Sequence, residues 1–240
     1  MKRFVSISSH PGKTGTTYYN GYFSRLGLPY VYEAKGYRSL EEAVEDLKQI
    51  KDLHGISVSM PFKAEVIKYL DIASKDVQIH KSCNTVKVAG DIWTGYNADL
   101  SGAHYVAGLV DDSDSIAILG NGSIGKMIKT VINRGKTSMF SRSLGNWELR
   151  TKGSPTVIIN ATALGTTIKN SPLLTIPEGT RLVIDLAIKP NDLAKQCYES
   201  SVCYIGGMEF YKHQFLEQFK IYTSIVPDPE IFDEIRRQCA

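Results

Sequence analysis

The chain has 240 residues, 42% of them hydrophobic and 22% charged, with a formal net charge of +3. These values are ordinary for a globular protein and allow one large domain or two small ones. The small charge and the dispersed basic residues predict no nucleic-acid partner. No stretch approaches the roughly 20 apolar residues of a membrane span, and the cysteines and histidines lack zinc-ligand spacing. Four cysteines without a pairing pattern and a start without an apolar leader predict a cytoplasmic protein.

The first hundred residues alternate between strand and helix patterns. Ser39 and Glu42 stand in capping-box register at the start of one helix. Ala89-Gly90-Asp91 separates two short β-prone runs and predicts a hairpin. We expect mostly parallel strands, with this hairpin as the antiparallel exception. The predicted strands are 3–8, 30–33, 55–60, 85–88 and 92–96, and the predicted helices are 16–26, 39–50 and 63–70.

A second series of strands and helices follows the acidic stretch 111–115. Its nearly continuous apolar runs are typical of strands that are buried on both faces of a parallel sheet. Only residues 141–155 separate two of the strands, so we expect this half to lack a helix or a strand there. The predicted strands are 115–119, 137–140, 156–160 and 181–186, and the predicted helices are 99–110, 124–133, 208–224 and 227–239.

The segment SIAILGNGSIGKM contains a glycine loop between a strand and a helix. Gly120, Gly122 and Gly125 form the GxGxxG pattern of dinucleotide-binding folds. The first glycine permits a tight turn, the second lets the backbone approach a pyrophosphate, and the third lets the helix pack on the strand. The alternative is a turn with a structural role only. Because the motif lies between a strand and a helix, we favour a dinucleotide site.

The end of the next strand carries the signal for the choice of cofactor. NAD-binding folds place a carboxylate there for the ribose 2′-hydroxyl, whereas NADP-binding folds place an arginine. Here the sequence reads Ser141-Arg142-Ser143, and no carboxylate follows until Glu148. The guanidinium of Arg142 offers a planar set of donors for a 2′-phosphate, although a solvated surface arginine would fit the same position. We predict NADP.

Two charged residues in the first half are candidates for chemistry. Lys63 follows a strand and a proline, and Asp99 follows the hairpin. A lone lysine is usually a solvated charge, and Asp99 would serve equally well as a helix N-cap. Met60 and Phe62, which flank the proline, are expected to be buried supports, and the aromatic run 18–23 is expected to pack in the core. The local pattern alone leaves the catalytic role of Lys63 and Asp99 open.

Several motifs occur in one order along the chain: VSMPFK, NTV, GxNxDxxG, GNGSIG, INAT with Gly165, Asp185 with Pro190, and Gly207 with Gln214 before FKIYT. This ordered set resembles the shikimate dehydrogenase family over essentially the whole chain. The GTTxxN element at 15–20 is similar to that of the shikimate dehydrogenase-like subgroup. Because the motifs lie in both halves of the chain, the resemblance does not depend on the glycine loop alone.

The resemblance implies an α/β substrate domain at 1–104, completed by C-terminal helices 211–240, and a Rossmann-like NADP-binding domain at 105–210. It also implies reversible reduction of 3-dehydroshikimate to shikimate by hydride transfer, the chorismate-pathway reaction of aromatic amino acid biosynthesis. The implied ligands are NADP and a ring hydroxy acid of the shikimate or quinate type, with no nucleic acid, membrane or metal. The implied protein is a monomer or a homodimer.

The resemblance also implies roles for individual residues. Lys63 would donate a proton to the carbonyl oxygen, with Asp99 as its partner, and such general acid help is worth roughly 10²–10⁴-fold in rate. Substrate contacts would come from Ser59, Asn84 and Gln214 at ring hydroxyls and from Thr14 and Thr16 at the carboxylate. The implied cofactor contacts are Gly120, Asn121, Gly122, Ser123, Ile124, Gly125, Ser141, Arg142, Ser143, Ala161, Thr162 and Gly207.

Two departures from the family pattern concern the substrate. Ile188 stands where a tyrosine normally lines the pocket, and Ser57 replaces a common asparagine. A dehydrogenase for quinate or another hydroxylated ring acid is therefore an alternative. A ligand sensor without catalysis is a second alternative, which the presence of both Lys63 and Asp99 disfavours.

Overall fold

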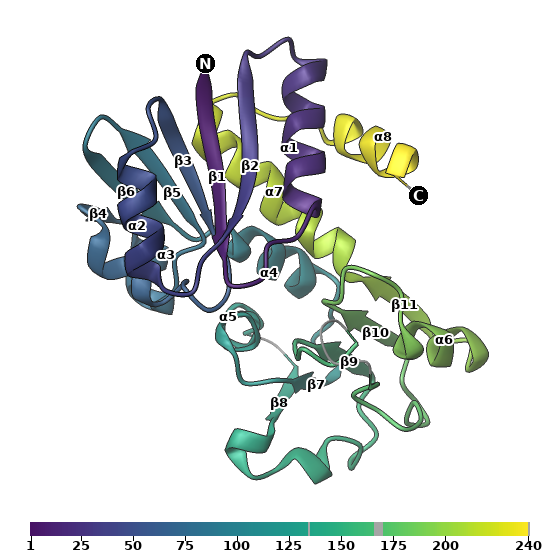
Figure 1. Ribbon diagram of the computed structural model, residues 1–240. Helices are drawn as coiled ribbons and strands as arrows, with labels where there is room; N and C mark the ends of the chain where they lie inside the picture. The colour runs from purple at the N-terminus through teal and green to yellow at the C-terminus, as the bar shows by residue number, and fades with distance from the viewer. Residues whose placement is uncertain (134, 166–169, 240) are drawn as a thin grey trace. The chain divides into compact units, whose positions relative to one another are not determined.

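The computed structural model describes residues 1–133, 135–165 and 170–239 and divides the chain into two compact units (Figure 1). The first unit comprises Met1–Ala98 and Phe215–Ala240, and the second comprises Asp99–Gln214. Helix α7, Gly207–Thr223, begins in the second unit and ends in the first. Among the helices described, none has the length and apolar character that crossing a bilayer requires.

A six-stranded mixed sheet forms the centre of the first unit, with strand order β2-β1-β3-β5-β6-β4. Strands β2, β1 and β3 run parallel, while β5 and β6 form the predicted antiparallel hairpin. The expectation of a single antiparallel pair is wrong, because β3 and β5 are also antiparallel. The chain returns to the sheet at the end where β3 stops, as the hydrogen bond from Val58 N to Asn84 O shows. The strands are β1 Lys2–Ser8, β2 Tyr30–Gly36, β3 Leu53–Val58, β4 Ile72–Ala73, β5 Thr85–Ala89 and β6 Ile92–Tyr96.

Alternation along β1 builds two apolar layers on the sheet of the first unit. Val5 and Ile7 join an apolar core with helix α2, Leu40–Lys48. Phe4 faces the opposite layer, where its ring centroid lies 5.4 Å from that of Phe23. Successive side chains of a strand point to opposite faces, so one strand serves both layers. Ser39 caps α2 as predicted, since its hydroxyl accepts a hydrogen bond from Glu42 N at 3.2 Å.

The aromatic layer joins helix α1, Thr14–Arg25, to the C-terminal helices. Burial of each large ring in this layer contributes about 1.5–3 kcal/mol to folding, and Tyr22 and Phe219 are fully buried. The core role predicted for the aromatic run of α1 is confirmed, because all its aromatic side chains are buried. The members are Tyr18, Tyr19, Tyr22 and Phe23 of α1, Phe215, Phe219 and Tyr222 of α7, and Phe232 of α8, Pro229–Cys239.

The second unit contains a five-stranded parallel sheet with strand order β11-β10-β9-β7-β8. Ile116 and Ile118 of β7 face one core layer with helices α4 and α5, and Ala117 and Leu119 face another with helix α6. The helices are α4 Asp99–Gly108, α5 Ser123–Val131 and α6 Asp192–Glu199. The strands are β7 Ser115–Leu119, β8 Lys136–Phe140, β9 Val157–Asn160, β10 Leu182–Asp185 and β11 Cys203–Gly206.

The segment between β8 and β9 is short, as the sequence indicates. Within its described residues it contains two 3-10 helices, η2 Arg142–Leu144 and η3 Trp147–Leu149, and neither an α-helix nor a strand. The expected reduction of this half is therefore confirmed. It leaves β8 at an edge of the sheet.

Several local predictions need correction. Residues predicted as a helix at 63–70 form a short 3-10 helix, η1 Glu65–Tyr69, because the chain is soon extended again at Leu70. Four elements are absent from the predictions, namely β4, β11, α6 and the six-residue helix α3, Lys75–His80. Short elements carry too few residues for a periodic pattern to be visible.

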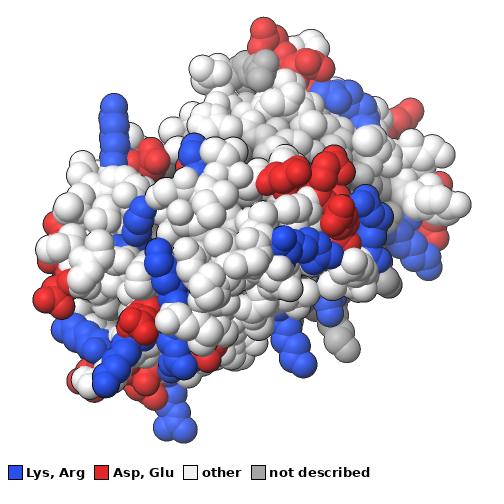
Figure 2. All heavy atoms as spheres, turned by 90° about the horizontal axis from the view of Figure 1, so that it is seen from above, with Lys and Arg blue, Asp and Glu red and all other residues white. Residues whose placement is uncertain are grey.

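Figure 2 shows one face of the molecule, where Lys and Arg side chains are interspersed with Asp and Glu side chains. This mixing agrees with the small net charge of +3.

Candidate functional site

The glycine loop connects β7 to α5 in the second unit, and its geometry explains each glycine. Gly120 has φ +111°, and a Cβ there would lie 2.7 Å from the carbonyl oxygen of Ala161. A Cβ at Gly125 would lie 2.4 Å from the carbonyl oxygen of Gly120, so only glycine lets the helix start this close to the strand. Gly122 is different, because a Cβ there would meet nothing within 4 Å. Its backbone is open to an approaching molecule.

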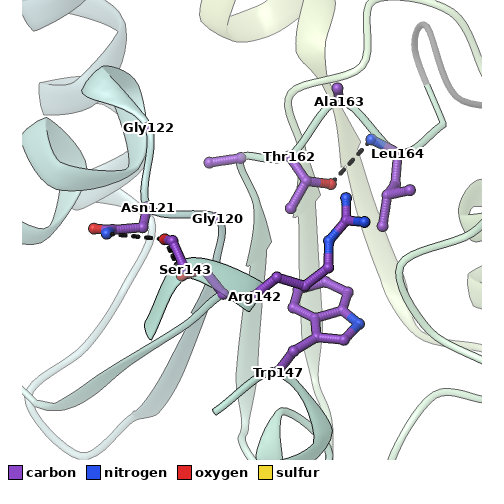
Figure 3. A pocket seen from close by; sticks show the side chains of 11 residues that line it. Gly120, Asn121, Gly122, Arg142, Ser143, Trp147, Thr162, Ala163 and Leu164 are labelled. Atoms are coloured by element: carbon purple, nitrogen blue, oxygen red, sulfur yellow. Dashed lines mark hydrogen bonds between the residues drawn. The ribbon is translucent and has the colours of Figure 1, made fainter. Parts of the chain in front are cut away.

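A cavity of about 400 Å³ lies in front of this loop (Figure 3). The structure brings eight of the predicted cofactor residues into its wall, namely Gly120, Asn121, Gly122, Ser141, Arg142, Ser143, Ala161 and Thr162. Trp147, Ala163 and Leu164 complete the described lining and were not predicted. Ser123, Ile124, Gly125 and Gly207 are not part of this lining. Gly207 instead packs against its own chain, since a Cβ there would lie 2.4 Å from the carbonyl oxygen of Leu186.

The segment after β8 supplies the polar side of the cavity. The hydroxyls of Ser141 and Ser143 are 2.9 Å apart, and Asn121 Nδ2 donates to Ser143 Oγ at 3.4 Å. Asn146 braces the segment, because its amide accepts from Ser141 N at 3.0 Å and donates to the carbonyl of Met139 at 2.9 Å. These bonds hold the hydroxyls beside the exposed side chain of Arg142.

Arg142 is the one charged residue among the described residues that line the cavity. In Figure 3 its guanidinium extends from the segment after β8 toward the loop of Thr162 and Leu164. Hydroxyls, an arginine and the N-terminus of α5 together form a donor-rich surface suited to phosphate groups. A cofactor with a 2′-phosphate fits this donor set, and an acid that would favour a free 2′-hydroxyl is absent from the lining that the structure describes.

The loop Ala161–Leu164 forms the opposite wall, and a buried amide holds it. Asn160, the last residue of β9, accepts hydrogen bonds from Thr162 N at 3.1 Å and from Thr162 Oγ1 at 2.7 Å. Thr162 Oγ1 in turn accepts from Leu164 N at 3.1 Å (Figure 3). The hydroxyl of Thr162 is thus engaged within the loop.

Asp185 anchors this arrangement from the end of β10. Its carboxylate is fully buried and accepts from Asn160 Nδ2 and Asn191 Nδ2, both at 2.8 Å. Ala187 N and the hydroxyl of Tyr204 also donate to it, at 3.1 and 3.2 Å. Burial and the neighbouring Asp185 raise the pKa of Tyr204 above its usual value, which keeps its hydroxyl a donor. Hydrogen-bond donors thus compensate the buried charge.

Lys63 lies in the first unit, in the turn that follows β3. Ser59 N donates to the carbonyl of Ile7 at 2.9 Å, and the Met60–Pro61 peptide is cis. Lys63 is half-buried, and its carbonyl accepts from Cys83 N at 2.8 Å, so the turn is tied to the start of β5. Phe62 is buried as expected, but Met60 is 64% exposed and the prediction of its burial is wrong. The chain turns at Pro61, which leaves the preceding side chain in solvent.

Asn84 precedes β5 and is buried, with 1% of its surface exposed. Its Oδ1 accepts two hydrogen bonds, from Ala98 N at 2.8 Å and from Thr85 Oγ1 at 2.7 Å. With both bonds on the oxygen, the orientation of the amide is determined. The bond to Ala98 also ties Asn84 to the residue directly before Asp99.

Gln218 of α7 completes this polar network and was missed in the sequence. Only 3% exposed, it accepts from Tyr19 Oη at 2.7 Å and from Ser57 Oγ at 3.1 Å. Its amide donates to the carbonyl of Asn84 at 3.1 Å and to Thr85 Oγ1 at 2.6 Å. Ser57, one of the two departures from the family pattern, is therefore a partner of Gln218. Nothing in the local sequence distinguishes this glutamine from an exposed one.

The remaining predicted residues lie at helix starts or along α7. Thr14 is the first residue of α1 and Thr16 lies in its first turn, while Lys13 occupies the N-cap position. Asp99 is the first residue of α4 and is 1% exposed. Gln214 is half-buried on α7, and Ile188, after β10, is 37% exposed.

Comparison with known proteins finds similarity to shikimate dehydrogenases. A family profile described as the shikimate dehydrogenase substrate binding domain matches residues 14–86. The shikimate dehydrogenase (NADP(+)) of Pyrococcus furiosus is 29% identical over 243 residues, covering 90% of this chain and 88% of that enzyme. The shikimate dehydrogenase (NADP(+)) of Methanococcus aeolicus is 26% identical over 266 residues, covering 95% of each. The chain is similar to these shikimate dehydrogenases over most of its length, and the part that matches the substrate-binding profile lies in the first unit. The resemblance predicted from the ordered motifs is thereby confirmed.

Solved structures named as shikimate dehydrogenases share this fold. The Thermus thermophilus shikimate 5-dehydrogenase, crystallised with NADP(H) and shikimate, matches with a TM-score of 0.85 at 22% identity over 100% of both chains. A chorismate mutase/shikimate 5-dehydrogenase fusion protein from Clostridium acetobutylicum matches with a TM-score of 0.87 at 22% identity, over 100% of this chain and 97% of its own. The predicted fold class is confirmed by these matches.

Proposed function

We propose that this chain is a member of the shikimate dehydrogenase family and an NADP-dependent oxidoreductase that interconverts 3-dehydroshikimate and shikimate. The observation that carries the proposal is the cavity of the second unit, where Arg142, two serine hydroxyls and the open backbone of Gly122 meet. This donor set suits a dinucleotide with a 2′-phosphate. The relatives named as NADP(+)-dependent enzymes support the same cofactor.

The proposed chemistry divides between the cofactor and the chain. Bound NADPH supplies the hydride for the ring carbonyl. As negative charge develops on the carbonyl oxygen, the Lys63 ammonium stabilises it and donates a proton to it. Asp99 is proposed as the carboxylate partner that orients the ammonium. In the reverse direction Lys63 accepts the proton of the ring hydroxyl.

The proposed substrate contacts follow the resemblance. Ser59, Asn84 and Gln214 are assigned to ring hydroxyls, and Thr14 and Thr16 to the carboxylate. The fixed amide of Asn84 and the position of Thr14 at the start of a twelve-residue helix support these assignments. Backbone N–H groups at such a start favour an anion.

Two residues favour a second candidate substrate, quinate or another hydroxylated ring acid. Ile188 offers an apolar side chain where the family pattern has a tyrosine hydroxyl. Ser57 donates to Gln218 instead of offering an asparagine amide. Both changes remove hydrogen-bonding groups from the predicted substrate pocket, and the reaction class stays the same. A cytoplasmic monomer or homodimer, without nucleic-acid or membrane partners, remains part of the proposal.

A spectrophotometric screen tests the activity. Shikimate, quinate and related ring acids would be incubated with NADP+ and with NAD+, and reduced cofactor would be measured. We expect turnover with NADP+ and one of these acids. Absence of turnover with every acid and both cofactors would contradict the proposed function.

The role of Lys63 is tested by Lys63→Ala, which we expect to lower kcat by roughly 10²–10⁴-fold while NADPH binding survives, because the residue acts as a general acid. Exposed Lys75 at the start of α3 provides a matched control, and Lys75→Ala should keep wild-type turnover. Turnover of Lys63→Ala close to that of the wild type would refute the assignment.

A further inference from the structure

Trp147 lies in the wall of the cavity, in the reduced segment between β8 and β9. It begins the 3-10 helix η3 and is half-buried. Figure 3 shows its indole on the same side of the cavity as Arg142, which lies five positions earlier in the same segment. Among the described lining residues it is the only aromatic one.

Arg150 holds the indole in place. Its guanidinium carbon lies 4.4 Å from the centroid of the Trp147 ring, which is cation–π geometry. The same guanidinium donates to the carbonyls of Trp147 at 2.9 Å and Pro172 at 2.8 Å. The Arg150 side chain is only 15% exposed, so this arginine is committed to bracing the segment. The guanidinium of Arg150 therefore stabilises the wall of the cavity, and the charged group that lines the cavity is Arg142.

The indole also packs against the core of the second unit. Trp147 contacts the layer that contains Leu119, Ile158 and Val183. Core packing and the guanidinium of Arg150 therefore both restrict rotation of the ring. The remaining surface of the indole faces the cavity.

We propose that Trp147 forms the wall against which the adenine base of bound NADP packs. The inference rests on the proposed function, because it requires a dinucleotide whose 2′-phosphate is bound by Arg142. The 2′-phosphate and the adenine are attached to the same ribose, so the base must lie within a few ångströms of the phosphate site. Trp147 supplies an aromatic surface at that distance along the same wall, and Leu164 and Ala163 supply apolar surface across from it.

Stacking of a base on an aromatic side chain contributes about 1–3 kcal/mol by alanine substitution. This range corresponds to roughly a 5- to 150-fold change in affinity. A phenylalanine keeps an aromatic face at the position, whereas a leucine keeps only apolar bulk. The three substitutions Trp147→Phe, Trp147→Leu and Trp147→Ala therefore separate stacking from simple filling of space.

The test uses adenosine 2′,5′-bisphosphate, which contains the base and the 2′-phosphate but no nicotinamide. The chain has two tryptophans, and the second, Trp93, is 8% exposed in the first unit. Trp93→Phe leaves Trp147 as the sole indole fluorophore. We expect its emission to change on titration with adenosine 2′,5′-bisphosphate and to stay constant with nicotinamide mononucleotide.

Calorimetry of the Trp147 variants gives the second readout. We expect Trp147→Ala to weaken adenosine 2′,5′-bisphosphate roughly tenfold and Trp147→Leu nearly as much, while Trp147→Phe stays within about threefold of the wild type. Affinity for nicotinamide mononucleotide should not change. If Trp147→Ala fails to fold, the fluorescence of Trp93→Phe, where Trp147 is intact, still shows whether the ligand contacts Trp147.

The outcomes separate the two proposals. If the wild type does not bind adenosine 2′,5′-bisphosphate, the proposed NADP site is overturned together with the role of Trp147. If the wild type binds it but the emission of Trp147 does not change and the variants bind equally well, Trp147 is a core residue only. The proposed function then stands and the further inference is wrong.

Discussion

Arg142→Ala is expected to change the preference between the two nicotinamide cofactors. Within the described lining of the cavity, Arg142 supplies the positive charge, and the serines beside it donate only neutral hydrogen bonds. Removing it takes away a charge-assisted contact to the 2′-phosphate and leaves the glycine loop intact. NADH has no 2′-phosphate and should be bound almost as before.

The magnitude follows from the exposure of Arg142. Hydrogen bonds to charged groups contribute about 1.5–3 kcal/mol, and the lower part of that range applies because the side chain is exposed to water. A loss of about 1.5–2 kcal/mol weakens NADPH roughly 10- to 30-fold. The difference should shrink at high ionic strength, where surface charges are screened.

The assay is calorimetric titration of each variant with NADPH and with NADH. Arg142→Lys keeps the charge but loses the planar set of donors, and we expect it to be intermediate. Lys129→Ala, which removes an exposed cation of α5 outside the cavity lining, serves as the control. Equal losses for NADPH and NADH in Arg142→Ala would refute a contact between this arginine and the 2′-phosphate.

Two further predictions concern stability. Asp114 is 4% exposed, and hydrogen bonds led by that from Arg181 lower its pKa from 3.8 to about 2. A lowered folded pKa stabilises the fold above about pH 4, and this contribution is lost as the pH falls toward 2. Since Arg181 is half-exposed, we expect Asp114→Asn to lower the free energy of unfolding by only about 1–2 kcal/mol at pH 6 and by little at pH 2.5. Urea unfolding measures both values. A loss that does not depend on pH would argue against the ion pair. Gln218→Leu should lower the free energy of unfolding by about 2–4 kcal/mol, because it leaves the buried hydrogen-bond partners of the amide unsatisfied. It should also raise the KM for the ring acid more than it changes kcat, because Thr85 then loses its donor and the amide of Asn84 is less fixed. Exposed Gln49→Leu is the control, and an unchanged KM for Gln218→Leu would show that the network is structural only.

The elements that the sequence predicts well are those with long or unambiguous patterns. The parallel strands of the second unit are continuous apolar runs, and the glycine loop between β7 and α5 makes close backbone approaches that Gly120 and Gly125 permit. The aromatic run of α1 predicts burial because such rings have no favourable place in water. Elements of a few residues, such as α3 and β4, escape prediction because no periodicity develops over so short a length.

Some residues of the cavity wall can be predicted from the sequence and others cannot. Arg142 and the glycines can be found in the sequence because a motif places them next to a strand end. Trp147 cannot, since no motif includes it and its position depends on how the short segment after β8 folds.

By itself, the sequence determined the order of motifs, the class of fold and the residue types available for a phosphate and a proton transfer, because these depend on local spacing and local geometry. The tertiary structure alone decided that Gln218 joins the network around Asn84, that Asp185 holds the loop of Thr162, and that Trp147 lines the cavity. These contacts join residues far apart in the chain. Such contacts depend on how strands and helices pack, and a linear pattern carries no information about that packing.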